Sequence, residues 1–311
     1  MQIFHDLDKI EKNEKTVITL GTFDGIHLGH RKIIEMLVNK STALGGRNFL
    51  VTFHPHPRSV IVKDRKVRLL STLDEKIPIL ELIGVHNLLI INFTKEFSQK
   101  TSYEFVKEYF VDKIGVDEIV IGYDHHFGKG RDGNVEALCK MGKKFGFKVT
   151  SVDAVCVDNI TVSSTEIRNA LSEGNIPLAN KLLDRRYSFS GVVVEGDKRG
   201  RELGFPTANI EVIGDDKFLP KIGIYLVEIN VENKNYYGLM SIGKRPTFYE
   251  SGYVTTEVYV MDFSKEIYGQ SVTVNIIERI RDEEKFSSAE ELIEQMKKDE
   301  EKGKEIINNL N

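Results

Sequence analysis

Histidine is the residue type whose distribution points most directly to chemistry in this chain of 311 residues. There are eight histidines, and all of them lie before residue 127. Six fall in three short clusters: His27/His30, His54/His56 and His125/His126. Imidazole can hydrogen-bond to phosphate oxygens, and it is also a common metal ligand. The two halves of the chain must therefore use different chemistry.

The segment GTFDGIHLGH at residues 21–30 carries the first cluster and links an expected strand to an expected helix. Its three glycines permit tight turns and a close approach of the backbone to a ligand. The free N–H groups at the start of the helix suit a phosphate, to which His27 and His30 could donate. Asp24 could contact the same ligand or simply tie the turn. A glycine-rich turn with two incidental histidines is the competing interpretation, because a short glycine loop alone is a weak signal.

Zinc binding is a second hypothesis for the histidines. The six clustered side chains, with Asp24 or Asp124 added, could ligate zinc. Against this, the chain contains no HExxH and no C-x-x-C sequence. Its two cysteines, Cys139 and Cys156, do not make a disulfide framework either. The sequence therefore favours phosphate chemistry over a metal centre.

Short apolar runs alternate with helical patterns through the first half of the chain. The expected strands are 17–20, 48–53, 88–93, 118–123 and 148–155, and the expected helices lie near 30–44, 73–83, 102–114 and 134–145. This alternation predicts a Rossmann-like α/β domain with a parallel sheet covered by helices. The segments 21–30, 53–57 and 122–128 each follow a strand. We therefore expect them to converge on the carboxyl edge of the sheet, where ligands bind in such folds.

The second half changes character after residue 184. Its expected strands are 187–195, 222–230, 236–242, 254–260 and 272–280, and a polar helix runs from about 288 to 310. Several strands alternate apolar and polar residues, as half-buried antiparallel strands do. The pattern predicts a β-barrel or a sandwich with a terminal helix, and of the two we expect the antiparallel barrel. Because the chain is longer than a single core usually holds, the sequence predicts two domains, 1–184 and 185–311.

The segment GVVVEGDKRGRELGFPTANI at residues 191–210 is the candidate site of the second half. Glycines with basic residues can wrap a polyphosphate, although GxxxxGK[ST] is absent. A charged hairpin loop is the competing interpretation.

Earlier in the chain, Ser163-x-x-Glu166 forms a capping box that would start a helix.

The histidine segment and the capping box both resemble motifs of one enzyme family. GTFDGIHLGH resembles the HxGH signature of nucleotidylyltransferases, in the form found in FMN adenylyltransferases, and SSTEIR (163–168) is similar to their SSTxIR motif. The resemblance implies that His27 and His30 contact nucleotide phosphates and that Arg168 neutralises charge as pyrophosphate departs. It adds the following ATP- or phosphate-binding residues: Gly21, Phe23, Asp24, Gly25, Ser163, Ser164 and Thr165.

Two further segments fit the same family. FHPHP (53–57) resembles its strand-end segment, and GYDHHFG (122–128) is similar to Gly-x-Asp/Asn-Phe-x-Phe-Gly. The match implies that Asp124 and Phe127 contact the flavin or the nucleotide. His125 replaces the usual phenylalanine, which puts a packing or stacking role at this position in doubt.

The second half resembles riboflavin kinases. GRELGFPTAN (200–209) closely matches their signature, which implies that Thr207 and Asn209 contact Mg²⁺ and ATP phosphates, with Lys198 and Arg201 assisting. TTEVYVMDF (255–263) matches the strand that bears the catalytic glutamate, here Glu257, which would accept the proton of an attacking hydroxyl. A solvent-facing strand glutamate is the competing interpretation.

Smaller departures and weaker candidates complete the kinase pattern. Tyr259 stands where kinase relatives often carry histidine. Arg281 and Glu283 lie in RIRDEEKF (279–286), which is similar to a segment that approaches the flavin. A surface salt-bridge cluster explains these two charges equally well.

The order of the motifs, adenylyltransferase first and kinase second, is that of the bifunctional riboflavin kinase/FMN adenylyltransferases. The resemblance spans roughly residues 16–300. It implies that ATP and Mg²⁺ serve two reactions: phosphorylation of riboflavin to FMN, and adenylylation of FMN to FAD with release of pyrophosphate. A related nucleotidylyltransferase with another substrate and a non-catalytic flavin-binding regulator remain as alternatives.

Composition limits the partners of the chain to small molecules. The net charge is −4, with 41% hydrophobic and 29% charged residues, and a general nucleic-acid binder would show a basic excess. No apolar run is long enough to span a membrane, and the first residues lack an apolar signal core. We therefore expect a cytoplasmic protein, and the family resemblance implies that its partners are riboflavin, FMN and ATP.

Overall fold

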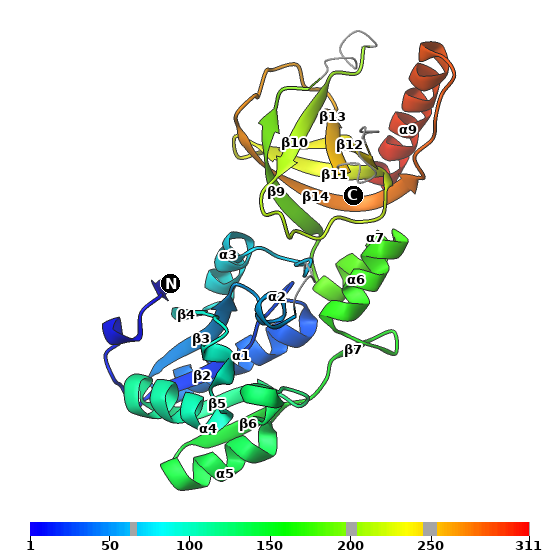
Figure 1. Ribbon diagram of the computed structural model, residues 1–311. Helices are drawn as coiled ribbons and strands as arrows, with labels where there is room; N and C mark the ends of the chain where they lie inside the picture. The colour runs from blue at the N-terminus through cyan, green and yellow to red at the C-terminus, as the bar shows by residue number, and fades with distance from the viewer. Residues whose placement is uncertain (63–66, 197–203, 245–253, 311) are drawn as a thin grey trace. The chain divides into compact units, whose positions relative to one another are not determined.

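The computed structural model divides the chain into two compact units, Met1–Ser164 and Thr165–Asn311. It describes residues 1–62, 67–196, 204–244 and 254–310 (Figure 1). The division between the two units falls at the start of a helix, earlier in the sequence than the domain boundary expected at 184/185. A compact unit and a catalytic domain need not share a boundary, so the domain limits stay a prediction.

A six-stranded sheet forms the centre of the first unit, and every strand pair in it is parallel. Its order is β1-β4-β3-β2-β5-β6 (Figure 1). The strands are β1 (Gln2–Phe4), β2 (Thr16–Leu20), β3 (Arg47–His54), β4 (Asn87–Asn92), β5 (Val116–Gly122) and β6 (Lys148–Val152). All residues of β2 are buried, as expected for a parallel strand covered on both faces. The predicted parallel sheet is confirmed.

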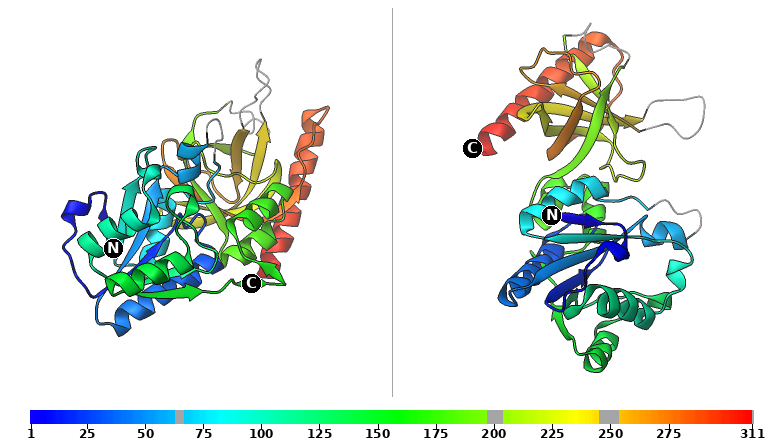
Figure 2. Two further views of the ribbon diagram at one scale, coloured as in Figure 1. Left: turned by 60° about the horizontal axis from the view of Figure 1, so that its bottom comes forward. Right: turned by 90° about the vertical axis from the view of Figure 1, so that its left-hand side faces the viewer.

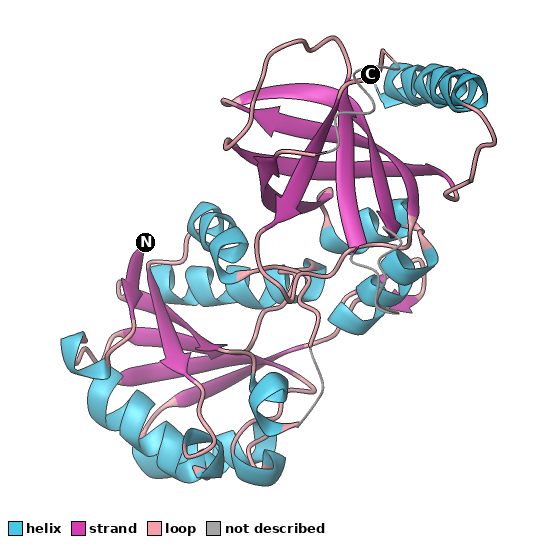
Figure 3. Ribbon diagram, turned by 45° about the horizontal axis from the view of Figure 1, so that its top comes forward, coloured by secondary structure: helices cyan, strands magenta, loops and turns pink. Residues whose placement is uncertain are grey.

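Helices cover both faces of this sheet (Figure 3). They are α1 (Leu28–Ala43), α2 (Pro57–Ile61), α3 (Leu73–Ile83), α4 (Ser102–Phe105) and α5 (Val135–Phe145). The expected helix at 102–114 starts as α4 and continues in wider π-helical turns as η3 (Val106–Ile114). Short connections add η1 (Leu7–Lys9), η2 (Phe97–Gln99), η4 (Lys129–Arg131) and a hairpin of β7 (Cys156–Val157) and β8 (Ile160–Thr161).

Local sequence explains where helix α3 begins and ends. The Thr72 side chain accepts from the backbone N–H of Glu75, and the Glu75 carboxylate accepts from the Thr72 N–H, which completes a capping box. Gly84 ends the helix in the left-handed region, with φ 102°. Lys76 and Leu80, one helical turn apart, form its buried stripe.

The second unit contains a closed barrel of six strands in the order β10-β13-β12-β11-β14-β9, with antiparallel pairing. The strands are β9 (Tyr187–Val194), β10 (Thr207–Val212), β11 (Gly223–Val231), β12 (Lys234–Lys244), β13 (Val254–Val260) and β14 (Ser271–Arg281). Buried and half-buried residues alternate along β9, so one face fills the barrel and the other faces outward. The expected barrel is confirmed, with β10 as an additional strand.

The described residues outside the barrel strands include the helices α6 (Ser164–Glu173), α7 (Ile176–Leu183) and α9 (Ala289–Leu310). The terminal helix α9 lies along the outside of the barrel, where Ile306 and Ile307 pack against Leu226 and Leu239 (Figure 2). Gly303 of α9 permits this approach, because a Cβ there would lie 3.3–3.5 Å from barrel side chains. Within the described ranges, no helix combines the length and apolarity needed to cross a membrane.

Candidate functional site

The histidine segment lies at the point where the order of the parallel sheet reverses. From β2 the chain adds β3 and β4 on one side, and later adds β5 and β6 on the other side. The connection from β2 to α1 therefore lies beside the connection that follows β5. Open α/β sheets bind ligands in the crevice at this switch point. The segments 21–30 and 122–128 therefore lie side by side, at the carboxyl ends of the neighbouring strands β2 and β5.

The turn between β2 and α1 has an unusual backbone. Phe23, Gly25 and Ile26 all adopt positive φ values, of 46°, 88° and 39°. Side chains other than glycine rarely take this conformation, and such residues cluster at functional sites. Packing holds the turn in place, because Phe23 and Ile26 are buried in the core between the sheet, α1 and α3.

The two histidines of this turn stand at the N-terminus of α1. His27 is the N-cap, and its Nδ1 accepts from the backbone N–H of His30 at 3.3 Å. The two rings stack with centroids 3.6 Å apart, and the Phe23 ring meets His30 edge to face at 5.2 Å. Gly29 leaves room for this stack, because a Cβ there would lie 3.3 Å from the His27 ring. The arrangement combines a helix N-terminus with two imidazoles, which suits a phosphate group.

Asp24 ties several segments to the turn. It is 3% exposed, and its Oδ1 accepts from the backbone N–H groups of Leu70 at 2.9 Å and Ser71 at 3.1 Å. Its main-chain carbonyl accepts from Ser164 Oγ at 2.8 Å. The structure therefore brings the start of the SSTEIR motif to the histidine turn. Ser163 directly precedes α6, while Thr165 and Arg168 lie within that helix, in the second unit.

The segment after β5 places an aspartate and two stacked rings at the other side of the crevice. The Asp124 carboxylate lies over Gly122, where a Cβ would be 3.5 Å from its Oδ1. Phe127 packs against Phe105 of α4, with ring centroids 6.1 Å apart. His125 stacks on Phe127 at 5.8 Å with the rings 28° from parallel, so it does take a stacking position.

The His125 imidazole is unusual in its surroundings. The residue is partly exposed, yet its Nε2 is buried and has no hydrogen-bond partner among the described residues. Burial lowers the pKa of His125 to about 4, against a smaller raising effect from Asp124. The ring is therefore neutral at neutral pH.

The remaining histidine cluster lies after β3. His54 is exposed at the strand end, and His56 caps α2 by accepting from the Arg58 N–H at 3.1 Å. In the part of the chain that the structure describes, no group of three or more His, Cys, Asp or Glu side chains is placed to hold a metal ion. The zinc hypothesis thus gains no support from geometry.

The second candidate site lies on the outer face of the barrel. Asn209 of β10 and Glu257 of β13 are directly paired across the two strands. Thr207 Oγ1 donates to Glu257 Oε2 at 3.3 Å. All three are half-buried and alternate with buried residues such as Val258, so they project away from the barrel core.

Glycine and aromatic neighbours shape this barrel site. A Cβ on Gly196 would lie 2.0 Å from Asn209 Nδ2, so the backbone passes directly over the asparagine side chain. Tyr259 meets the Phe205 ring edge to face at 5.1 Å. The predicted residues Lys198 and Arg201 lie outside the described residues.

Arg281 and Glu283 take different positions. The Arg281 guanidinium binds Asp299 of α9 through Nε and Nη2, at 2.8–3.0 Å, and Asp299 is 4% exposed. Glu283 is exposed, and its carboxylate lies over Gly243 of β12, where a Cβ would be 2.6 Å away. Ser241, on the same face of β12 as Gly243, pairs in register with Glu257. Glu283 therefore lies over the face of β12 that is next to Glu257 of β13.

Comparison with known proteins matches both halves of the chain. The family model described as FAD synthetase covers residues 9–166, and the one described as Riboflavin kinase covers residues 183–307. The bifunctional riboflavin kinase/FMN adenylyltransferase of Listeria monocytogenes is 39% identical over 285 residues, which cover 91% of this chain and 90% of that protein. That of Bacillus subtilis is 36% identical over 310 residues, covering 98% and 96%.

The chain belongs to the bifunctional riboflavin kinase/FMN adenylyltransferase family. This confirms the resemblance drawn from the motifs and makes the chain an ATP-using transferase with an adenylyltransferase domain and a kinase domain. A solved structure titled as a macrolide-efflux protein from Streptococcus pneumoniae is 31% identical, with a TM-score of 0.88 over 96% of this chain and 97% of that one. The family fold therefore extends over nearly the whole chain.

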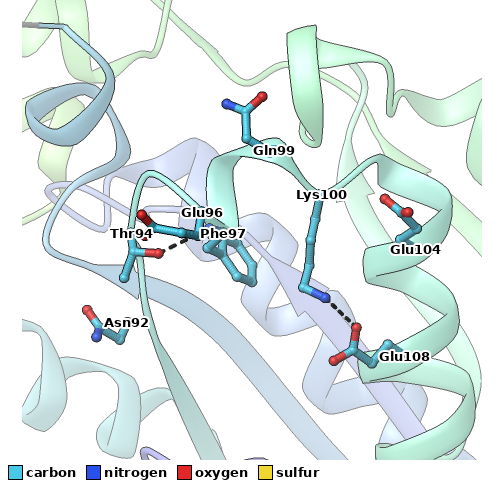
Figure 4. A pocket seen from close by; sticks show the side chains of 8 residues that line it. All are labelled: Asn92, Thr94, Glu96, Phe97, Gln99, Lys100, Glu104 and Glu108. Carbon is cyan, nitrogen blue, oxygen red and sulfur yellow. Dashed lines mark hydrogen bonds and ion pairs between the residues drawn. The ribbon is translucent and has the colours of Figure 1, made fainter.

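A surface pocket of about 590 Å³ is lined by residues outside the family motifs (Figure 4). It follows β4 and is lined by Asn92, Thr94, Glu96, Phe97, Gln99, Lys100, Glu104 and Glu108. Lys100 Nζ forms an ion pair with Glu108 Oε2 at 2.5 Å, and the Glu104 carboxylate accepts from the backbone N–H of Thr101. These charged side chains of the pocket are therefore engaged by neighbouring protein groups. None of the predicted site residues lines it.

One residue near the adenylyltransferase motif was not predicted from the sequence. Lys76 of α3 is 8% exposed, and its Nζ donates to the Thr22 carbonyl at 3.1 Å. The available signal was a lysine one turn before Leu80 on the apolar stripe of a helix. This pattern predicts that Lys76 is buried. It does not predict that Thr22 accepts its hydrogen bond, because the two residues are 54 positions apart in the sequence.

Proposed function

We propose that this chain phosphorylates riboflavin to FMN and adenylylates FMN to FAD, using ATP at two separate sites. The observation that carries the proposal is that each of the two matched family segments contains a cluster of side chains suited to bind phosphate groups. The first has stacked imidazoles at a helix N-terminus and a sheet switch point. The second has Thr207, Asn209 and Glu257 together on two paired strands.

For FAD formation we propose that a phosphate oxygen of FMN attacks the α-phosphorus of ATP and that the bond to pyrophosphate breaks. No protein nucleophile is needed, so catalysis consists of alignment and stabilisation of charge. His27, His30 and the N–H groups that begin α1 donate to phosphoryl oxygens. Gly21, Phe23 and Gly25 shape the turn, and Asp24 holds it through its backbone contacts.

The remaining adenylyltransferase roles are proposed from the family motifs. Ser163, Ser164 and Thr165 bind ATP phosphates, and Arg168 neutralises the departing pyrophosphate. Because these residues lie in and just before α6, we extend the proposed adenylyltransferase domain to residue 184 and assign residues 185–311 to the kinase domain. Asp124 and Phe127 contact the flavin or the nucleotide from the segment after β5.

For FMN formation we propose that the terminal ribityl hydroxyl of riboflavin attacks the γ-phosphorus of ATP and releases ADP. Glu257 accepts the hydroxyl proton, which is the role a positioned carboxylate plays in phosphoryl transfer. Its half-buried position beside Thr207 places it at the side chains that would hold the phosphates. Lys198 and Arg201 assist the phosphates in this proposal.

We propose that Thr207 and Asn209 also hold Mg²⁺. The donor set fits this ion, because a hydroxyl, an amide carbonyl and a nearby carboxylate supply the oxygen ligands that Mg²⁺ prefers. When bound, the ion neutralises charge on the ATP phosphates. We assign riboflavin binding to Glu283 and Arg281. In this proposal, Arg281 acts indirectly, by fixing the segment that carries Glu283. Since both reactions consume ATP, we place the enzyme in the cytoplasm.

Incubation of the purified protein with riboflavin, ATP and Mg²⁺ tests the proposal. Chromatography of the flavins should show FMN and then FAD, with one pyrophosphate released for each FAD. Supplied FMN should be converted to FAD without riboflavin. Failure to form FMN rejects the kinase, and failure to convert FMN rejects the adenylyltransferase. Flavin binding without ATP turnover would instead identify a regulator.

A further inference from the structure

A buried ammonium group lies beneath the histidine turn, and none of the roles proposed above uses it. Lys76 projects from α3 and is 8% exposed. Its Nζ donates to the main-chain carbonyl of Thr22 at 3.1 Å. Thr22 stands between Gly21 and Phe23, at the start of the positive-φ turn that leads to the histidines.

An ammonium group is an uncommon occupant of the apolar stripe of a helix. Lys76 occupies the apolar stripe of α3 together with Leu80, facing the core that contains Phe23 and Ile26. Desolvating a charge costs several kcal/mol, and an apolar side chain could fill the same place without that cost. The hydrogen bond from Lys76 to the Thr22 carbonyl connects this charge to the turn itself.

The contact lies at the start of a short physical path to the imidazoles. Lys76 fixes the Thr22 carbonyl, which Thr52 Oγ1 also approaches at 3.5 Å. The next residue, Phe23, has φ 46° and places its ring edge on His30 at 5.2 Å. His30 in turn stacks on His27. A shift of the Thr22 peptide would thus move the ring that supports the histidine pair.

We propose that Lys76 is a positioning residue of adenylyl transfer, which fixes the turn through Thr22 and adds positive potential beneath its phosphate site. The proposal rests on the function proposed above. The ligand class is a polyphosphate, bound as the triphosphate of ATP or as the pyrophosphate product. The positive charge acts in the same direction as the N-terminal end of the α1 dipole.

The test uses the full chain with Lys76→Met, which keeps the length of the side chain and removes its charge and donor. The turnover number for FAD formation from supplied FMN should fall about tenfold, as expected for loss of a charge-assisted hydrogen bond. Inhibition by inorganic pyrophosphate should weaken by a similar factor. The KM for FMN and the rate of FMN formation from riboflavin should stay within about twofold of wild type.

A matched control is available in the barrel. Lys217 is 2% exposed, and its Nζ donates to the Ser188 carbonyl at 2.7 Å. Lys217→Met makes the same chemical change and should leave FAD formation from FMN unaltered. Lys76→Gln keeps a donor for Thr22 and lacks the charge. It replaces the methionine variant if that variant is unfolded by circular dichroism, and it should still weaken pyrophosphate inhibition.

Two results would overturn the inference. One is a folded Lys76→Met protein with wild-type FAD formation and wild-type pyrophosphate inhibition. The other is an equal loss of both activities, which would show a general structural role. Absence of FAD formation in the wild-type protein would instead reject the proposed function, so the two failures are distinguishable.

Discussion

At the residue scale, His125 shows how this chain departs from its family pattern. The ring keeps the stacked position on Phe127, but it brings a nitrogen into a place where Nε2 is buried without a partner among the described residues. A buried polar atom without a partner costs about 1–3 kcal/mol. His125→Phe restores the family residue, and should raise the free energy of unfolding by about 1 kcal/mol at pH 7.

The same histidine gives a pH dependence with a defined sign. The pKa of His125 is about 4 in the folded protein, below its ordinary value of 6.5. The unfolded chain therefore takes up the proton first, and folding stability falls as pH falls from 6.5 to 4. The contribution is about 3 kcal/mol across this range.

Urea unfolding of the wild-type and His125→Phe proteins between pH 4 and 7 checks this expectation. The variant should lack the contribution of His125, so the stability difference should widen as pH falls. A difference that stays constant with pH would show that burial does not depress the pKa of this ring.

Residue types and spacing make His27 and His30 candidate site residues, and the family resemblance adds Glu257; all three roles stay predictions. Residue types and spacing do not predict the stacked geometry of the two imidazoles, because this depends on the positive-φ turn and on the Phe23 ring. They also do not predict the partner of Lys76. That contact depends on how α3 packs beside the turn, which is a property of the fold.

At the element scale, α9 is fastened to the barrel by one buried ion pair. Arg281 ends β14 and binds Asp299 of α9 in a two-point contact, with the carboxylate 4% exposed. Removing one partner of a buried pair leaves an uncompensated charge, which costs about 3–5 kcal/mol. Asp299→Asn should therefore lower the unfolding free energy of the barrel unit by about 3 kcal/mol.

Denaturant unfolding measures this change, and α9 offers a matched control. Glu294 and Lys298 form an exposed ion pair on the same helix, at 2.8 Å. Glu294→Gln should give no measurable change. Equal stability of the two variants would mean that the buried pair does not hold the helix.

Gly196, which follows β9, lies close against the Asn209 side chain. Alanine at Gly196 would place its Cβ 2.0 Å from Asn209 Nδ2, so the amide must move. Because small misplacements at a phosphoryl-transfer site are costly, Gly196→Ala should slow FMN formation by at least about tenfold. FAD formation from supplied FMN serves as the internal control. Unchanged FMN formation would remove Asn209 from the kinase site.

Most elements could be predicted from periodicity, as β13 at Val254–Val260 illustrates. Strand β10 was missed because its residues belong to a segment dominated by glycines and charges, where a loop is the natural expectation. Its strand form depends on pairing with β9 and β13. The π-helical turns of η3 also have no signature in the apolar pattern that marks a helix at 102–114.

At the scale of the whole molecule, we propose that the two folds of the chain hold a polyphosphate in different ways. One uses a helix N-terminus at the reversal of a parallel sheet, and the other uses side chains on the outer face of a barrel. Order and type of the two domains followed from motif order. Their boundary at 184/185 stays a prediction, because α6 and α7 lie between the strongly patterned segments of the two domains.

The most direct test of two separate sites is a pair of flavin assays on two folded variants. Glu257→Gln with riboflavin and ATP should form no FMN, yet convert supplied FMN to FAD at the wild-type rate. His30→Ala with riboflavin should accumulate FMN and form little FAD. If either variant loses both reactions to the same degree, the two activities share one site, which contradicts the assignment of one ATP site to each domain.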